Sequence, residues 1–456
     1  MNAVVALESL ETGFTKKLIA LALPICVQMV LFNMLSLVDV LMLGAFGEAQ
    51  VAAAGLASRI MFVTVIVLVG VAAGATILGA QYYGAKNHEG LKTAYGMAIA
   101  VGLLLMIPVA LAFLIWPAAM AMIATADPVV LNYTGQYLMI MGPTVLMSAL
   151  IIPLESAMRT IHATQAPTWI SAIAIATNIF FNWLLIFGNW GMPQLEIVGA
   201  AWASVIGRTV HLLLCVLVVY RVYPVIAVRW LHLLQIFDWA KLARFAKLSV
   251  PLIINESLWV LGIFAYGVIY GRMGTAELAT VNMLTPIEGV MISVFVGLAI
   301  ATSILVGNEL GAGRFGRARA IARYLLWVLP ASGVVAGGLI ALSYPLLKHV
   351  YPGVSAETLS MAENLLILLG LIMWSKVLNM VLILGILRAG GDNNFVLYSE
   401  VVSMWGVGVP LAALMAFVLG WPLYLVFLAT FIEEFIKAIM GFWRYRSGKW
   451  LKNLAQ

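Results

Sequence analysis

Three polar side chains in otherwise apolar stretches could carry chemistry. Asp39 lies near the end of the apolar run 18–43, and Asn178 and Asn182 lie within the run 167–187. Because Asn178 and Asn182 are four residues apart, they share one face of a helix and can bind the same partner. A carboxyl group donates a hydrogen bond when protonated and only accepts when ionised, so its proton decides which amide groups it engages. Asp39 is therefore the first candidate for a proton-dependent site.

The runs that carry these residues are long enough to cross a membrane. Apolar residues make up 64% of the 456 residues and charged residues only 10%. This composition excludes a soluble domain and predicts an integral membrane protein. A helix rises about 1.5 Å per residue, so about 20 apolar residues span the hydrocarbon core. An ionisable group inside such a run is costly unless protein or water solvates it, which makes each one a candidate site.

The apolar runs, separated by short polar or Gly/Pro-rich breaks, predict an all-α fold of twelve transmembrane helices. Basic residues gather in the connections on one side, and only Arg272 and Lys348 fall on the other. The positive-inside rule therefore places both termini in the cytoplasm. The net charge of +6 orients the protein in this way and requires no nucleic-acid partner. The predicted spans are residues 18–43, 51–81, 93–116, 129–158, 167–187, 197–220, 248–270, 277–306, 318–343, 358–387, 394–419 and 422–443.

The two halves of the chain are copies of one another. An ungapped offset of 227 residues aligns Pro24 with Pro251 and pairs many small residues. Six spans separate the copies, so both halves cross in the same direction and are related by a pseudo-two-fold axis along the membrane normal. The pairs include Gly44 with Gly271, Gly47 with Gly274, Gly70 with Gly297 and Gly84 with Gly311. We predict two six-helix lobes, an N-lobe of residues 1–221 and a C-lobe of residues 248–456 with a basic tail, joined by a cytoplasmic link of residues 222–247.

Several stretches resemble the multidrug and toxic compound extrusion (MATE) transporters. They are LALPICVQMVLFNMLSLVDVLMLG in the first span, VGVAAGATILGAQYYGAKN at the end of the second, VGAAWAS in the sixth, and VGLAIATSILVGNELGAGR in the second half. The resemblance covers nearly the whole chain, and its N-lobe pattern is closest to DinF-like bacterial and archaeal members. It implies the export of amphipathic, often cationic compounds, driven by inward flow of H⁺ or Na⁺.

The resemblance also implies a coupling site and substrate cavity in the N-lobe. On the first helix, Asp39 matches the family's acid and Pro24 matches its kinking proline. Tyr137 matches a tyrosine of the fourth helix, and Asn178 and Asn182 match a polar pair of the fifth. Some relatives have a second carboxylate where this chain has Asn182, and Ser204 only roughly matches a polar position of the sixth helix. These departures leave the coupling ion open, with H⁺ expected ahead of Na⁺.

A second candidate lies in the C-lobe. Glu256 follows Pro251 by five residues and matches an acid on the seventh helix of the NorM-like branch. That branch's acid on the tenth helix falls near Val377, beside Lys376, so a NorM-type sodium site is incomplete. Glu256 either pairs with Lys376 as a structural ion pair or binds a cation or cationic drug. An ammonium group repels a metal ion, so we predict no metal site there.

Together, residues and resemblance predict a secondary active multidrug exporter rather than an enzyme. We expect it in the bacterial inner membrane as a monomer that contacts lipids and small amphipathic or cationic drugs. No phosphate-binding loop of the Walker type is present, so we expect no cofactor, only a coupling ion. Protonation of Asp39 is expected to bend the first helix at Pro24. A flippase for lipid-linked oligosaccharides would need a cationic cavity, and an intramembrane enzyme would need a His, Asp or Glu cluster at one membrane face.

Overall fold

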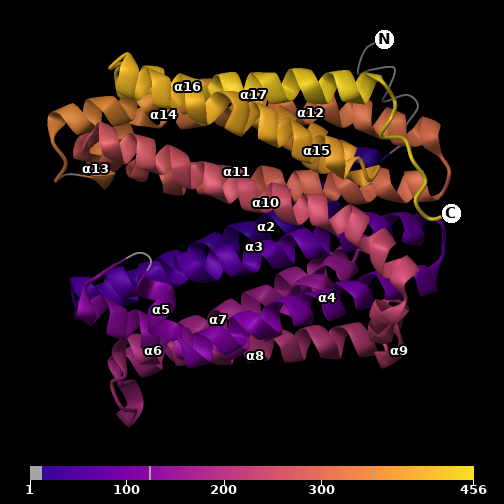
Figure 1. The fold of residues 1–456 in the computed structure, drawn as a ribbon, viewed down its shortest axis with the longest axis horizontal. Coiled ribbons are helices and arrows are strands. Elements are labelled where there is room, and N and C mark those ends of the chain that lie inside the picture. The colour runs from indigo at the N-terminus through magenta and orange to yellow at the C-terminus, as the bar shows by residue number, and fades with distance from the viewer. Residues whose placement is uncertain (1–12, 123–124, 352) are drawn as a thin grey trace. The chain divides into compact units, whose positions relative to one another are not determined.

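Helices make up all the regular structure in the described part of the chain. The computed structural model describes residues 13–122, 125–351 and 353–456. The long helices of these residues correspond to the predicted spans (Figure 1). They are α2 (Phe14–Leu43), α3 (Glu48–Gly84), α4 (His88–Ile115), α6 (Pro128–Thr160), α7 (Gln165–Phe187), α8 (Glu196–Arg221), α10 (Trp239–Met273), α11 (Thr275–Gly311), α12 (Phe315–Leu342), α14 (Ala356–Asn379) continued by η6 (Met380–Leu387), α15 (Asn393–Glu400) continued by η7 (Val401–Gly408), α16 (Val409–Ala413) and η8 (Leu414–Val418), and α17 (Leu423–Arg446).

Within the described residues, eleven helices are long and apolar enough to cross a membrane. The remaining predicted span, α17, carries Glu433, Glu434 and Lys437 near its middle. Lys437 is only 7% exposed and forms ion pairs with Glu433 and with Glu400 of α15. The charge of α17 is therefore neutralised inside the protein, which is the usual way for charged groups to persist at membrane depth.

The described chain forms two compact units. One is Leu23–Ile253, and the other consists of residues 13–22 with Ile254–Leu454. The chain thus passes from one unit to the other near Pro24 within α2 and near Pro251 within α10. Because proline lacks a backbone N–H and interrupts the helical hydrogen bonds, both passages lie where a helix bends easily.

Helices α7 and α8 of the first unit pack closely because α8 presents glycine to α7. A Cβ atom on Gly199 would lie 2.6 Å from the carbonyl oxygen of Leu185, and one on Gly207 would lie 3.0 Å from Cβ of Asn178. Small residues let membrane helices approach until their backbones nearly touch. This approach places Ser204, on the same face of α8, against Asn178.

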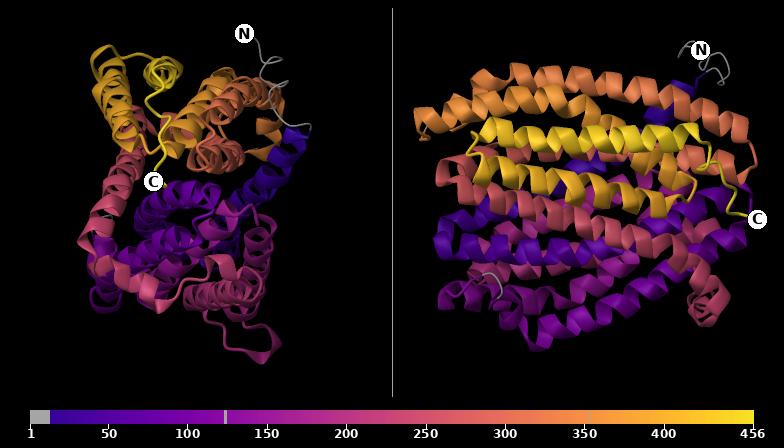
Figure 2. Two further views of the ribbon diagram at one scale, coloured as in Figure 1. Left: turned by 90° about the vertical axis from the view of Figure 1, so that its right-hand side faces the viewer. Right: turned by 45° about the horizontal axis from the view of Figure 1, so that its top comes forward.

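Helices α12 and α14 of the second unit meet in the same way. A Cβ atom on Gly337 would lie 2.1 Å from the carbonyl oxygen of Gly370, and a Cβ atom on Gly370 would lie 2.4 Å from the carbonyl oxygen of Gly337. Helix α17 packs against α14 and η7. In Figure 2, α17 is the yellow helix beside the orange and gold helices of this unit. These contacts position the charged residues of α17 against α14 and α15.

The segment predicted as a link is largely helical. It contains η3 (Pro224–Ile226), α9 (Trp230–Leu233) and η4 (Leu234–Phe237), and α10 begins at Trp239 rather than near residue 248. Asp238 accounts for this early start, because its Oδ1 accepts from the backbone N–H of Ala240 over 3.1 Å, as in a helix N-cap. The link packs on α4, where a Cβ atom on Gly96 would lie 2.7 Å from Cβ of His232. The remaining short elements are η1 (Gly44–Phe46), α5 (Pro117–Met122), η2 (Asn189–Gly191), η5 (Tyr344–Leu346) and α13 (Leu347–Val350).

Candidate functional site

The acid and the amides singled out in the sequence form one chain of hydrogen bonds. Nδ2 of Asn182 on α7 donates to Oδ1 of Asp39 on α2 over 2.6 Å. The same nitrogen donates to Oδ1 of Asn178 over 3.0 Å, and Nδ2 of Asn178 donates to Oγ of Ser204 on α8 over 3.1 Å. The carboxylate of α2 therefore contacts α7 directly and α8 through two buried amides.

Tyr137 and Pro24 lie in the same unit as this chain of hydrogen bonds. Tyr137 on α6 is buried, and its side chain lies close to Asp39 and Ser204. The carbonyl oxygen of Pro24 accepts a hydrogen bond of 2.8 Å from Oγ1 of Thr168 on α7. The segment of α2 from Pro24 to Asp39 is thus attached to α7 at both of its ends.

A second polar cluster, which the sequence analysis did not single out, surrounds Glu155 of α6. Its Oε1 accepts from Nε2 of Gln28 over 2.7 Å and from Oγ of Ser171 over 3.0 Å, and it lies 2.9 Å from Nε2 of His211. Nη2 of Arg159 donates to Oε2 of Glu155 over 3.2 Å and to Oε1 of Gln28 over 2.8 Å. These five residues, here called the Glu155 cluster, are all buried. The signal in the sequence is an acid followed by an arginine one helical turn later, near the end of an apolar run.

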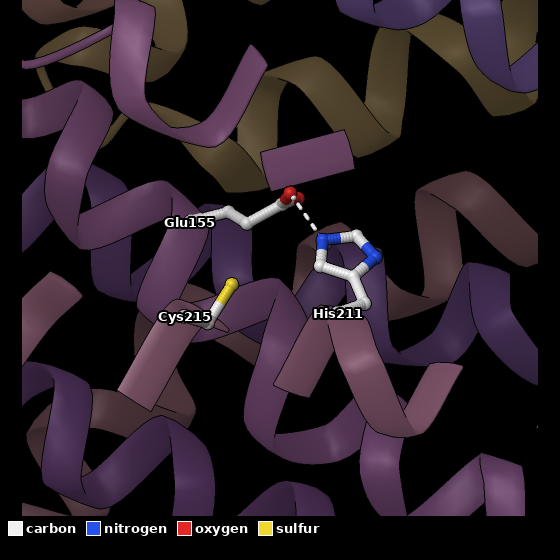
Figure 3. A group of neighbouring side chains, drawn as sticks. All are labelled: Glu155, His211 and Cys215. Atoms are coloured by element: carbon white, nitrogen blue, oxygen red, sulfur yellow. Dashed lines mark hydrogen bonds and ion pairs between the residues drawn. The ribbon is translucent and has the colours of Figure 1, made fainter. Parts of the chain in front are cut away.

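Two residues of the Glu155 cluster, Glu155 and His211, lie beside Cys215, and these three residue types are common metal ligands. Glu155, His211 and Cys215 each place one ligand atom within 4.8 Å of the others (Figure 3). The carboxylate of Glu155, however, already accepts from several protein donors, and the guanidinium of Arg159 sets a positive charge beside it. A buried carboxylate with such partners is neutralised and satisfied by the protein. The donor set therefore fits a hydrogen-bonded network better than a cation site.

Of the two alternatives left open for Glu256, the ion pair with Lys376 is wrong. Oε1 of Glu256 accepts from Nη1 of Arg388 over 2.8 Å, whereas Lys376 forms an ion pair with Glu288 of α11. Arg388 follows Lys376 by twelve residues, about 18 Å along a helix axis. Glu256 lies near the middle of α10, where it meets Arg388, and Lys376 is too far along its helix to reach it.

The second unit also differs from the first at the position of the acid. The duplication aligns Asp39 with Tyr266. The hydroxyl of Tyr266 donates to Oε2 of Glu433 over 2.6 Å, and Glu433 in turn pairs with Lys437 over 3.1 Å. A phenol stands where the first half has a carboxylate, so the two halves cannot bind a proton in the same way.

A family model for MatE matches residues 24–184 and 251–414. The chain belongs to the MatE family. The two matched segments of MatE begin at Pro24 and Pro251, the prolines that the internal duplication aligns. The family predicted from the sequence motifs is therefore confirmed. The MatE model matches the chain twice, and the two matches coincide with the two halves of the internal duplication.

Similar proteins agree with membership of MatE. The uncharacterized transporter YisQ of Bacillus subtilis (strain 168) is 25% identical over 448 residues, which is 96% of each chain. The probable multidrug resistance protein YoeA of the same organism is 27% identical over 400 residues, covering 85% of this chain and 84% of YoeA. A crystal structure of a MATE protein in complex with MaL6 superposes with a TM-score of 0.85 over 95% of this chain and 96% of that chain, at 15% identity. The predicted fold of a multi-pass helical membrane protein is confirmed, and the family is one of transporters rather than enzymes.

Proposed function

We propose that this MatE protein is a secondary active exporter of amphipathic or cationic drugs, driven by inward flow of H⁺ rather than Na⁺. The observation that carries the proposal is the hydrogen bond between Asp39 and Asn182. An ionised Asp39 accepts this bond and attracts a cation, whereas a protonated Asp39 has no charge and becomes a donor. A proton and a cationic drug thus compete for one carboxylate, and this competition is what exchange transport requires.

In this proposal, protonation of Asp39 is coupled to bending of α2 at Pro24. Oδ1 of Asn182 is buried and has no hydrogen-bond partner among the described residues. A protonated Asp39 donates to it once the amide turns, which replaces the present bond and so changes how α2 is attached to α7. The helix can respond at Pro24, where a backbone hydrogen bond is missing. Protonation then selects between two shapes of α2.

The proposal includes the setting of the transporter. We place the protein in the bacterial inner membrane as a monomer, with both termini in the cytoplasm and residues 222–247 as the link between the lobes 1–221 and 248–456. The one-sided distribution of basic residues supports this topology. No cofactor is required, because the ion gradient supplies the free energy.

Transport by reconstituted protein tests the proposal. We expect wild-type proteoliposomes to export a fluorescent cationic drug under an imposed pH gradient and not under a sodium gradient alone. Asp39→Asn removes the proton site while keeping the shape of the side chain, and should abolish export driven by the pH gradient. Glu256→Gln should slow export but keep its dependence on the pH gradient, because Glu256 is paired with Arg388 and is not the proton site of this proposal. Normal export by Asp39→Asn, or export by the wild type under sodium alone, would overturn the proposal.

A further inference from the structure

A buried arginine fastens α2 to α6 in the unit Leu23–Ile253. Arg159 lies in the last turn of α6 and donates to Oε1 of Gln28 over 2.8 Å and to Oε2 of Glu155 over 3.2 Å. Gln28 follows Pro24 by one helical turn and has no exposed surface. The guanidinium therefore joins the turn of α2 that follows the proline to the end of the fourth helix.

The other unit contains the same arrangement. Arg388 directly follows η6, at the end of the fourth helix of the second half, and donates to Oδ1 of Asn255 over 2.7 Å and to Oε1 of Glu256 over 2.8 Å. Asn255 follows Pro251 by one helical turn, and the duplication aligns it with Gln28. The acid differs in position, since the fourth helix supplies it in the first half and the first helix supplies it in the second. The arginines are also two residues out of register, because the duplication aligns Arg159 with Ile386. In each half, therefore, one arginine at the end of the fourth helix binds both an amide of the first helix and a carboxylate. We call this arrangement the clamp.

We propose that Arg159 and Arg388 are positioning residues that hold one side of a hinge in each half. The chain passes between its two units near Pro24 and near Pro251, so a bend at either proline changes the direction in which the helix leaves its unit. Charge-assisted hydrogen bonds are the strong ones, and these hold the turn after each proline. Bending is therefore confined to the proline and does not spread along the helix. The inference rests on the proposed function, because it takes the first helices to bend during transport.

Arginine suits this role better than lysine. Its planar guanidinium presents several donors in a fixed fork, so one side chain can hold an amide oxygen and a carboxylate oxygen together. A lysine ammonium is a single point of charge on a flexible stem and would hold the two acceptors less rigidly. Glu155 and Glu256 supply the negative charge that each buried guanidinium needs.

Distances between spin labels test the hinge without any measurement of transport. Val27 on α2, in the turn after Pro24, and Trp169 on α7 belong to one unit and are 42% and 69% exposed, so both accept labels in a background where Cys26 and Cys215 are replaced by alanine. With the clamp intact, we expect one narrow distance distribution that Asp39→Asn leaves unchanged. In Gln28→Ala and in Arg159→Gln, we expect a wider distribution that shifts when Asp39→Asn is added. Distributions as narrow as the wild type's in both variants would overturn the proposal.

A transplant of the acid separates a hinge from a merely structural bond. Glu155→Gln should widen the distribution, and adding Met29→Glu should narrow it again, because Met29 is aligned with Glu256 and rebuilds the arrangement of the second half. Failure of this rescue would contradict the equivalence of the two clamps. Gln28→Ala is the mildest variant and carries the test if Arg159→Gln does not fold. If the wild type shows no proton-driven export, the proposed function is refuted, but the label distances are unaffected. The two failures are therefore distinguishable.

Discussion

The hydroxyl of Tyr266 donates a 2.6 Å hydrogen bond to Glu433 at the position where the first half of the chain has Asp39. The carboxylate of the second unit lies on its last helix and is paired with Lys437. Asp39, in contrast, has a neutral amide as its hydrogen-bond partner. Duplication has therefore produced two halves of the same architecture with different chemistry, and the proton site that we propose belongs to the first half alone.

The two asparagines of α7 should differ in importance for export. Asn182 donates to a carboxylate, and a hydrogen bond to a charged group contributes about 1.5–3 kcal/mol. Asn178 donates to a neutral hydroxyl, which contributes about 1 kcal/mol. We expect Asn182→Ala to slow proton-driven export by about tenfold or more and Asn178→Ala by less. Initial rates in proteoliposomes provide the measurement. Thr177→Ala is the control, because Thr177 is only partly buried and its hydroxyl donates to the carbonyl oxygen of Ile173 in its own helix. Equal rates for Asn182→Ala and Thr177→Ala would contradict the prediction.

Removal of Lys437 should destabilise the protein strongly. Its ammonium lies 3.1 Å from both Glu400 and Glu433, and all three side chains are less than 10% exposed. Lys437→Met leaves buried carboxylates unpaired, and breaking a buried pair in this way costs about 3–5 kcal/mol. Thermal unfolding in detergent micelles should show a clear fall in the midpoint. Lys241→Met is the matched control, since Lys241 is half exposed in its pair with Asp238 and should leave the midpoint unchanged. Similar midpoints for the two variants would refute the buried ion pairs.

The hydrogen bond between Thr168 and Pro24 should affect turnover more than drug binding. Thr168→Val keeps the shape of the side chain and removes the donor to the carbonyl oxygen of Pro24. The loss of one such bond costs about 1 kcal/mol and changes the balance between the two shapes of α2. We expect a several-fold change in the maximal export rate with an unchanged drug Kd, measured by fluorescence binding. Thr64→Val serves as control, because Thr64 donates to a carbonyl of its own helix. A change in Kd without a change in rate would argue against a role in bending.

The contact between Gly96 and the link should be intolerant of bulk. A Cβ atom on Gly96 would lie 2.7 Å from Cβ of His232 and 2.9 Å from its carbonyl oxygen, and the latter cannot move without moving α9. Gly96→Leu should therefore displace α9 from α4, with overpacking of about 1–3 kcal/mol. Limited trypsin digestion should then cleave after Arg229 faster than in the wild type. Gly55→Leu in α3 is the control, because no atom lies within 4 Å of the added Cβ. Unchanged cleavage in Gly96→Leu would show that the link does not depend on this contact.

The sequence by itself determined the membrane class, the spans, the duplication and the family. Each of these depends on local or repeated patterns: apolar runs of sufficient length, an ungapped offset between halves, and motifs at fixed positions. Local periodicity also places Asn178 and Asn182 on one face of a helix. The start of α10 was predicted too late because the N-cap at Asp238 was not used.

Only the tertiary structure decided which charged groups meet. Glu256 contacts Arg388 and not Lys376, and Glu155 gathers partners from four helices, because pairing depends on the depth of each side chain and on the direction it faces around its helix. Apolar patterns fix neither quantity when almost every face of a membrane helix is apolar. Close packing at Gly207 and Gly337 sets the distances between helices, and those distances select the partner of each buried polar group.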